Sequence, residues 1–256
     1  MRKTFIILFS MMLCCIGCEW HLQSKNETSS TEFAIERFDL VEARYLSTGD
    51  VAALQQMNTE YPQQTRMLIE DLLQLGSVSD AEINKRFLLY FQDSTLQEIM
   101  SEVGRQYSDL SDIDKSLASA FASLHELLPQ IELPVVYTQI GSLDQSVVVG
   151  QHMLGISLDK YLGADYPLYV RYGYSEHQRH SMKRDFIVPD CISFYLLSLY
   201  PVPSDSLRHQ HMGKIQCVVN RVLSRLVFQN EHVVVAEKKM AEGYYSSYLQ
   251  MLESVD

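Results

Sequence analysis

The sequence has few basic residues. Of its 256 residues, 21 are Lys or Arg and 32 are Asp or Glu, which gives a formal net charge of −11. Arg2 and Lys3 lie in a predicted signal peptide, and removing it leaves a charge of about −13 on the mature chain. Nucleic acids and anionic lipid surfaces both bind proteins through basic surface. The composition therefore argues against both as direct partners and leaves protein partners open.

Recognisable catalytic motifs are also lacking. The sequence contains no Gly-x-Ser-x-Gly elbow and no phosphate-binding glycine loop. Asp159, Asp165 and Asp190 are separated acids without the spacing of a calcium-binding loop. We therefore assign no catalytic residue, no cofactor and no metal from the sequence.

Cysteine is scarce after the first 18 residues, where only Cys191 and Cys217 remain. Both lie in apolar helical patterns on either side of a turn at residues 200–203. Their distances from this turn differ by several ångströms along an antiparallel helix pair, which is unfavourable for a disulfide. We predict two buried free thiols.

The longest apolar run near the N-terminus extends from Phe5 to Gly17, after Arg2 and Lys3. It is too short to span a bilayer as a helix but suits the core of a signal peptide. A small residue followed by cysteine, here Cys18, is typical of bacterial lipoprotein signals, in which the cysteine thiol receives a diacylglyceryl group. The alternatives are an ordinary secretory signal and a membrane-facing cysteine cluster without modification. We predict a signal peptide at residues 1–17 and a lipid anchor on Cys18. The expected location is the bacterial cell envelope, in the outer membrane facing the periplasm.

The segment from His21 to Thr31 is polar and has no periodicity. Such a segment cannot pack a core, so we predict a flexible tether at residues 18–31. As a flexible coil it reaches only roughly 20 Å. The folded domain is therefore expected to act close to its own membrane.

Residues 32–131 have a helical pattern with clear start signals. Pro62 is expected to open a helix that Gly76 closes. Capping boxes are predicted at Ser79 with Glu82 and at Ser94 with Gln97, and Ser111 is predicted to cap the next helix. Apolar residues then recur on one face of that helix, at Ile113, Leu117, Phe121, Leu124 and Leu128.

The pattern changes between Pro134 and Leu158, where short β-branched runs are separated by Gly and Ser. We predict two or three strands there. Helical patterns return at residues 189–200, 204–228 and 236–253. The sequence therefore predicts an α+β fold, a predominantly helical single domain over residues 32–256 with a small sheet of two or three strands in the middle.

Five segments carry a resemblance to a known family. They are IERFD (Ile35 to Asp39), VVYTQIGSLD (Val135 to Asp144), LGISLDKYLGADYPLY (Leu154 to Tyr169), DFIVPD (Asp185 to Asp190) and the pair Gly213-Lys214. In this order they resemble the gliding-motility-associated lipoprotein family called GldB. The resemblance implies an envelope lipoprotein tied to gliding and to the secretion machinery on which gliding depends, and it implies no known catalytic activity.

Two departures from the family pattern stand out. His209 and His211 occupy positions that are hydrophobic or aromatic in the family, and the chain stops at Asp256, where family members usually continue. A shortened C-terminus is therefore expected.

The two neighbouring histidines raise the question of a metal site. On the helix predicted at 204–228, His209 lies about 200° around the axis from His211, so the two cannot ligate one ion. Zinc hydrolases of the H-E-x-x-H type need histidines at i and i+4 with Glu beside the first. Reading from His209, this chain has Gln210 and Gly213 instead. The motif is absent from this helix.

The other histidines are weaker candidates for metal ligands. His177 and His180 could share a helical face beside Glu176, but the segment is polar and a solvated surface is the simpler interpretation. His125 and Glu126 begin an H-E pair whose i+4 residue is Pro129, which cannot ligate.

Three hypotheses of function remain. The first is a non-enzymatic interaction or scaffold lipoprotein of the envelope, with other envelope proteins as partners. The second is a degenerate or cryptic zinc hydrolase with ligands from His177, His180 and His209. The third is a lipoprotein that binds a small ligand in a pocket between sheet and helices.

For the first hypothesis, tyrosines near the C-terminus suggest a contact surface. Tyrosine is enriched at protein interfaces relative to the rest of the surface. We name Tyr244 and Tyr245 as the candidate interaction surface, with Tyr248 as either surface or core.

Overall fold

A computed structural model describes residues 33–255 of the chain. The predicted signal peptide, the lipid anchor at Cys18 and the tether lie outside this range. Within it, no helix combines the length and apolar character needed to cross a membrane. The first section is helical, with α2 (Phe38–Thr48), α3 (Val51–Thr59), α4 (Pro62–Arg66) continuing as a π-helical segment (Met67–Leu72), α5 (Ile83–Tyr90), α6 (Ser94–Gln106) and α7 (Ser111–Leu127).

A three-stranded sheet follows, as the sequence predicts. It consists of β1 (Val135–Gln139), β2 (Val147–Gly150) and β3 (Met153–Ser157) in the order β1-β3-β2. Strand β3 pairs in parallel with β1 and antiparallel with β2, so the sheet is mixed. Tyr137 lies opposite Gly155 in the register, and a Cβ on Gly155 would come within 2.5 Å of the Tyr137 side chain. The close fit of this ring over the sheet therefore requires glycine at position 155.

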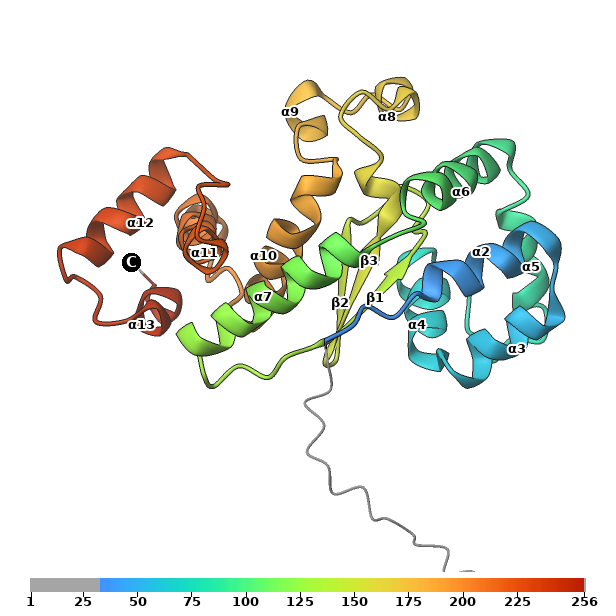
Figure 1. The fold of residues 1–256 in the computed structure, drawn as a ribbon, viewed down its shortest axis with the longest axis horizontal. Helices are drawn as coiled ribbons and strands as arrows, with labels where there is room; N and C mark the ends of the chain where they lie inside the picture. Colours follow the sequence, from blue (N-terminus) through green and yellow to red (C-terminus); the bar gives the residue numbers. More distant parts are fainter. Residues whose placement is uncertain (1–32, 256) are drawn as a thin grey trace, which may run out of the picture. The chain divides into compact units, whose positions relative to one another are not determined.

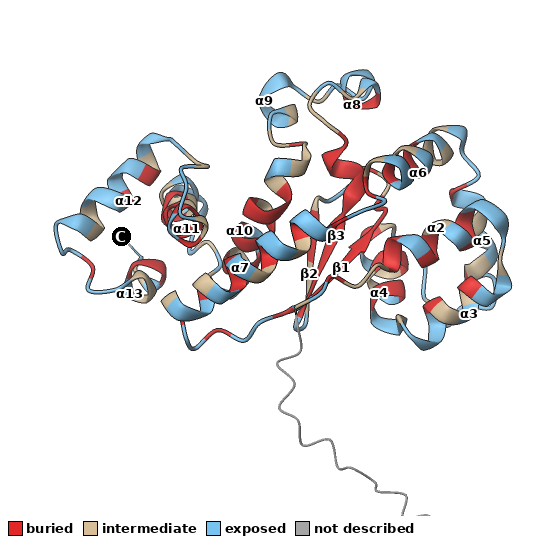
Figure 2. Cartoon of the chain, in the orientation of Figure 1, coloured by how far each residue is buried: buried red, intermediate tan, exposed pale blue. Residues whose placement is uncertain are grey.

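The remaining helices enclose the sheet and extend beyond it. Figure 1 shows α7 and α10 on one side of the sheet and α2 and α4 on the other. In Figure 2 the buried residues follow the strands and the helix faces that point towards them, and every residue of β3 is buried. This arrangement confirms the predicted α+β class. The C-terminal helices are α8 (Pro167–Arg171), α9 (Glu176–Arg179), α10 (Ile187–Leu199), α11 (Arg208–Leu223), α12 (Glu231–Ala241) and α13 (Tyr248–Glu253).

The apolar face predicted for α7 is confirmed. The ring of Phe121 packs against Phe33, with centroids 5.5 Å apart, and against Tyr195 at 6.1 Å. These contacts join α7 to the start of the described chain and to α10. All five predicted positions are buried: Ile113, Leu117, Phe121, Leu124 and Leu128.

The predicted caps are wrong in detail. At α6 the N-cap is Asp93, whose carboxylate accepts hydrogen bonds from the N–H groups of Thr95 and Leu96, and Ser94 is the first helical residue. The side chain of Gln97 turns away and donates to the carbonyl of Phe91 at 2.6 Å. The residue immediately before the predicted serine therefore caps this helix.

The predicted serine caps are also wrong at α5 and α7, whose N-cap residues Glu82 and Leu110 make no side-chain cap; aspartates accept hydrogen bonds nearby instead. Asp80 accepts from the N–H of Glu82 at 3.0 Å, and Asp109 accepts from the N–H of Ser111 at 2.9 Å. A charged carboxylate is a stronger acceptor than a hydroxyl. The helix predicted from Pro62 begins there, and its π-helical continuation ends at Leu72, before Gly76.

Of the three predicted C-terminal helices, the one at 189–200 is confirmed as α10, and the other two are shorter than expected. The helix predicted at 204–228 is a 3-10 turn followed by α11, which ends at Leu223 because Ser224 takes φ +50°. Leu226 consequently lies outside the helix and is 67% exposed. The helix predicted at 236–253 is two helices, because Gly243 with φ +74° follows α12 and Ser247 caps α13. Cys191 and Cys217 are free and buried, which confirms that prediction.

Candidate functional site

The segment Ile35 to Asp39 enters the fold beside β1. The N–H of Glu36 donates to the carbonyl of Val136 at 2.9 Å, and the N–H of Thr138 donates to the carbonyl of Glu36 at 3.0 Å. Glu36 thereby forms an isolated parallel bridge with Tyr137. Since β3 occupies the other side of β1, the first family-like segment lies directly against the second.

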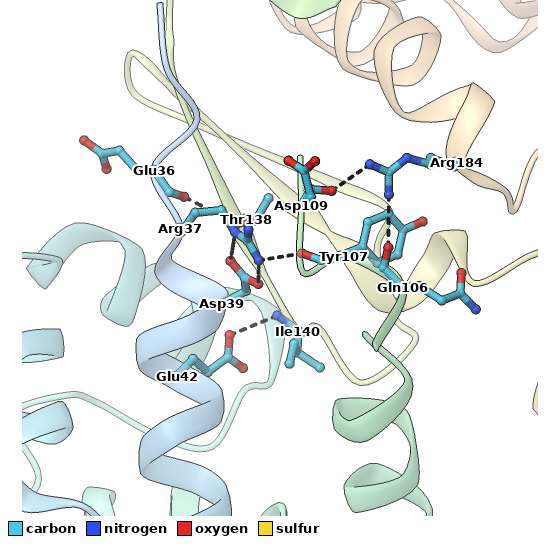
Figure 3. A network of polar contacts seen from close by, with 10 residues as sticks. All are labelled: Glu36, Arg37, Asp39, Glu42, Gln106, Tyr107, Asp109, Thr138, Ile140 and Arg184. Atoms are coloured by element: carbon cyan, nitrogen blue, oxygen red, sulfur yellow. Dashed lines mark hydrogen bonds and ion pairs between the residues drawn. The ribbon is translucent and has the colours of Figure 1, made fainter. Parts of the chain in front are cut away.

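Asp39 makes the main polar side-chain contacts of this segment. Its carboxylate forms a two-bond ion pair with Arg37, both bonds at 2.8 Å, and accepts from the hydroxyl of Thr138 at 2.5 Å (Figure 3). Arg37 also donates to the carbonyl of Tyr107 at 2.8 Å. Asp39 is only 2% exposed, and a buried carboxylate is tolerated when it is paired and hydrogen-bonded in this way. The contacts tie the start of α2 to β1 and to the connection between α6 and α7.

A second arginine, Arg184, also binds the connection between α6 and α7. Arg184 donates to the carbonyls of Gln106 at 3.2 Å and Asp109 at 2.8 Å (Figure 3). It also forms an ion pair with Asp112, and its hydrogen bond to that carboxylate lowers the pKa of Asp112. The guanidinium lies 5.0 Å from the ring centroid of Tyr107, a cation–π contact. The segment that begins at residue 185 is thus fixed to the first helical section.

Glu42 lies one turn further along α2 and is fully buried. Its Oε2 accepts from the N–H of Ile140 at 2.9 Å, and Oε1 has no hydrogen-bond partner among residues 33–255 (Figure 3). Burial raises the pKa of Glu42 well above its usual range, and the nearby charges of Asp159 and Asp39 raise it further. The environment therefore favours the uncharged acid.

Asp159 holds the loop that follows β1. Its carboxylate accepts from the N–H of Gly141 at 2.7 Å and from the N–H of Leu143 at 2.5 Å. Burial raises the pKa of Asp159, while these two hydrogen bonds lower it. Ser142 and Leu143 have φ values of +57° and +62°, a left-handed conformation that costs energy for residues with a side chain. The two hydrogen bonds stabilise this strained loop.

Lys160 fixes the same loop through its carbonyls. The Lys160 ammonium donates to the carbonyl of Leu143 at 3.1 Å and to that of Asp144 at 3.3 Å. It also donates to the hydroxyl of Tyr174 at 3.0 Å, and this hydroxyl donates to the carbonyl of Leu143 at 2.8 Å. Neighbouring side chains of the third segment therefore bind the N–H groups and the carbonyls of one loop.

Asp190 closes the network at α10. The hydroxyl of Tyr161 donates to its carboxylate at 2.9 Å. Burial raises the pKa of Asp190 to about 7, and the Tyr161 hydrogen bond opposes this rise. Asp190 therefore changes its charge near neutral pH, unlike an exposed aspartate.

Four family-like segments thus form one hydrogen-bonded assembly, which we call the motif network; it comprises residues 35–42, 135–144, 154–174 and 184–190. Its buried carboxylates bind backbone N–H groups, an arginine or hydroxyls. None of the contacts described joins Glu42 or Asp190 to Ser, Cys or His. Chemically, this network fixes backbone geometry, and burial within it raises the pKa of Asp190 to about 7.

The fifth segment lies apart, on α11. A Cβ on Gly213 would lie 2.5 Å from the Cβ of His232, so glycine is required where α11 and α12 approach each other. Lys214 is 3% exposed and donates to the carbonyl of Ser254 at 3.0 Å and to its hydroxyl at 2.6 Å. The pair therefore fixes α12 and the residue that follows α13 against α11.

The histidines occupy the positions expected from helical geometry. His211 is buried and its Nε2 lies 2.7 Å from the carbonyl of Tyr200, whereas His209 is exposed and stacks on His232. His180 packs edge-on against Phe186. Over residues 33–255 no three or more His, Cys, Asp or Glu side chains are placed to hold a metal. The structure does not gather His177, His180 and His209 into a site.

The two candidate tyrosines differ in exposure. Tyr244 is 60% exposed, but Tyr245 is only 4% exposed, so the prediction of Tyr245 as a surface residue is corrected. The rings meet edge to face with centroids 4.9 Å apart, and the Lys239 ammonium lies near both. Burial of Tyr245 follows from its packing beneath Tyr244 and beside Lys214. Of the two, Tyr244 can present its ring to a partner.

A cavity of about 940 Å³ lies between α4 with its π-helical continuation and the β2–β3 hairpin. It occupies the place expected for a pocket between sheet and helices. Arg66 and Met67 line one side, and Val148 and Val149 line the other. The sequence reasoning did not single out these residues.

The fold and the motif network define a class of protein: a mainly helical α+β domain built around segments joined through buried carboxylates. The model of a family described as gliding motility protein GldB matches residues 20–227, a range that includes all five segments. The chain belongs to this family. No curated protein and no solved structure matches it.

Proposed function

We propose that this chain is a lipid-anchored protein of the bacterial envelope that acts by binding other envelope proteins, as a non-enzymatic component of a gliding or secretion apparatus. The observation that carries the proposal is the match to the gliding motility family over residues 20–227. The motif network supports it, since its buried carboxylates bind backbone amides, hydroxyls and an arginine.

The anchor sets the place of action. Gly17 followed by Cys18 provides the lipid attachment, and the polar tether keeps the domain within roughly 20 Å of the membrane. An acidic domain held at this distance meets other envelope proteins and has little affinity for anionic lipid. These features support a protein that works on neighbours in its own membrane, for which we propose the outer membrane, facing the periplasm.

The test combines anchoring with isolation of partners. Wild type and Cys18→Ala are expressed in cells that lack the native gene, and membranes are separated from soluble protein. Wild type is expected in the membrane fraction with an acylated N-terminus, whereas Cys18→Ala becomes soluble or is held by its uncleaved signal. Affinity isolation from solubilised membranes is expected to recover defined envelope proteins with wild type only.

Two results contradict the proposal. One is a mature N-terminus without acyl chains. The other is a purified chain that elutes alone and hydrolyses peptide or ester substrates, or carries a stoichiometric small molecule.

A further inference from the structure

A cavity of about 410 Å³ lies beside the loop that follows β1. Its volume falls within the range of ligand pockets. Helix α6 contributes Leu96 and Ile99 to its lining, the loop contributes residues 142–144, and Tyr172 and Tyr174 follow α8. Three parts of the chain that are far apart in sequence therefore meet around one cavity, and its lining is mainly apolar and aromatic.

The loop has a strained backbone where it lines this cavity. Ser142 and Leu143 have left-handed φ values of +57° and +62°. The buried side chains of Asp159 and Lys160 bind the N–H groups and carbonyls of the loop and hold it in this conformation. Strained backbone persists only where surrounding contacts fix it, and it is concentrated at binding and active sites. The motif network therefore places Leu143 and Asp144 at the cavity.

Of the described residues that line the cavity, only Asp144 is charged. Its N–H donates to the carbonyl of Gly141, and its own carbonyl accepts from Lys160. Its carboxylate is exposed and has no ion pair or hydrogen bond within residues 33–255. The charge of Lys160 lies on the inner side of the loop, where it interacts with the carboxylate of Asp159. The carboxylate of Asp144 is therefore available to a ligand.

The surrounding charges favour a cationic ligand. Asp93, the N-cap of α6, and Glu98 are both exposed close to Leu96 in the sequence. Arg171 precedes Tyr172, but it does not line the cavity. The whole chain has a formal net charge of −11. A basic segment of a different protein is therefore favoured over an acidic segment and over a second copy of this chain, which would be repelled.

Tyr172 offers an aromatic ring to such a cation. It is 58% exposed, and its side chain makes no ring, cation–π or hydrogen-bond contact with any other residue of the described range. The ring of Tyr174 is already in use, because the Lys160 ammonium lies 4.5 Å from its centroid. A guanidinium is attracted to the face of an aromatic ring, and its planar donors match a carboxylate. Since Tyr172 and Asp144 line the same cavity, one arginine side chain can contact both.

We infer that this cavity binds a basic segment of a partner protein, with an arginine side chain that stacks on Tyr172, pairs with Asp144 and packs its methylene groups against Leu96. The methylene groups of arginine cover apolar surface while the charged head remains at the rim. The inference rests on the proposed function, since it locates the surface by which the protein holds its partner. It also explains why buried charged side chains are used to fix the loop at residues 141–144.

The test places the photoreactive side chain of p-benzoylphenylalanine at position 172, where it keeps an aromatic ring beside the cavity. The same side chain at exposed Gln55 on α3 is the positional control. Full-length, lipid-anchored protein is irradiated in intact cells, and the attached peptides are identified by mass spectrometry. Position 172 alone is expected to capture a segment of another protein that contains arginine.

Two substitutions in the protein with the probe at position 172 test the role of charge. Asp144→Asn removes the carboxylate charge and keeps the backbone hydrogen bonds of the loop. Glu126→Gln on α7 is the matched control, because Glu126 is also exposed and has no ion pair within residues 33–255. Asp144→Asn is expected to lower the captured yield about fivefold or more, whereas Glu126→Gln leaves it unchanged.

Four results of this experiment overturn the inference. They are equal capture from positions 172 and 55, capture of a second copy of this chain, a captured segment without arginine, and a yield that Asp144→Asn does not change. If lysine crosslinking in the same cells finds envelope partners but position 172 captures none, the inference is wrong and the proposed function stands. If neither method finds a partner, both are wrong.

A second measurement remains decisive if the probe at position 172 prevents folding. Purified full-length protein in detergent is mixed with acetyl-Gly-Arg-Gly-amide, or with the same peptide carrying citrulline, an uncharged analogue of arginine. Saturation-transfer difference NMR is expected to show transfer to the arginine methylene groups only. The transfer should be lost in Asp144→Asn and Tyr172→Ser and kept in Tyr172→Phe, which retains the ring. Equal transfer to both peptides, no transfer to either, or transfer that persists in Asp144→Asn overturns the inference.

Discussion

The carboxylate of Asp159 binds the N–H groups of both Gly141 and Leu143, at 2.7 Å and 2.5 Å, across the turn that follows β1. These two residues flank Ser142, and Ser142 and Leu143 have positive φ values. One side chain from the third family-like segment therefore fixes the loop of the second. This contact shows most clearly that the motif network stabilises the backbone.

Asp159→Asn is expected to lower the free energy of unfolding by about 2 kcal/mol, because its NH₂ group would oppose one of the two buried N–H donors. Asp165→Asn is the matched control, since that side chain is fully exposed and its ion pair with Arg179 is 3.7 Å long. Urea denaturation at pH 7 measures both variants. Equal stability of the two would contradict a structural role for the Asp159 carboxylate.

Asp190→Asn is expected to change how stability depends on pH. In the folded protein the pKa of Asp190 is about 7, above the unfolded value of about 3.9, so the folded state holds this proton more tightly. The contribution of Asp190 to stability therefore falls as pH rises from about 4 to 7. Asparagine still accepts from Tyr161 and cannot ionise.

The variant should match wild type near pH 4 and exceed it by about 1 to 4 kcal/mol at pH 8. Urea denaturation at several pH values provides the two curves. Parallel curves over this range would show that Asp190 does not titrate near neutral pH.

Gly213→Ala is expected to destabilise the protein by about 1 to 3 kcal/mol, since the new Cβ would overlap His232 at the contact of α11 and α12. Gly104→Ala is the control: Gly104 is exposed on α6, and an added Cβ there meets nothing within 4 Å. That substitution should stabilise by about 0.5 to 1 kcal/mol. Thermal unfolding measures the change in stability of both variants. A change in the same direction for the two would refute the packing argument.

Tyr245→Ser is expected to cost about 3 kcal/mol, because it removes a buried ring, while Tyr244→Ser should cost about 1 kcal/mol or less. The two residues are adjacent, so the pair is its own control. Differential scanning calorimetry compares the melting temperatures. If the two variants melt together, the assignment of Tyr245 to the interior is wrong.

Periodicity was sufficient to predict the larger elements. The apolar face of α7 and the β-branched runs of the sheet report directly on burial, and both were predicted at their observed places. The exact start of α6 was missed because Asp93 competes with Ser94 as the acceptor, and α5 and α7 begin without the predicted serine caps. Local propensity alone does not rank such neighbouring candidates.

The candidate site was only partly predictable. Asp39 was noted within a family-like segment, but Glu42 was not, although it lies four residues after Phe38 and four before Leu46 on the buried face of α2. An acidic residue at helical spacing between two apolar residues predicts a buried carboxylate. Its partner, the N–H of Ile140, is 98 residues away in the chain. Contacts of this range depend on the tertiary fold and leave no local pattern.

The central claim is that the protein holds other envelope proteins, and crosslinking mass spectrometry on intact cells tests it most directly. Wild-type protein is crosslinked at native abundance, with Cys18→Ala as the unanchored control. The account predicts reproducible crosslinks between lysines of residues 33–255 and a small set of envelope proteins, lost or strongly reduced for Cys18→Ala. Crosslinks no more frequent than background, or the same set from both proteins, would contradict it.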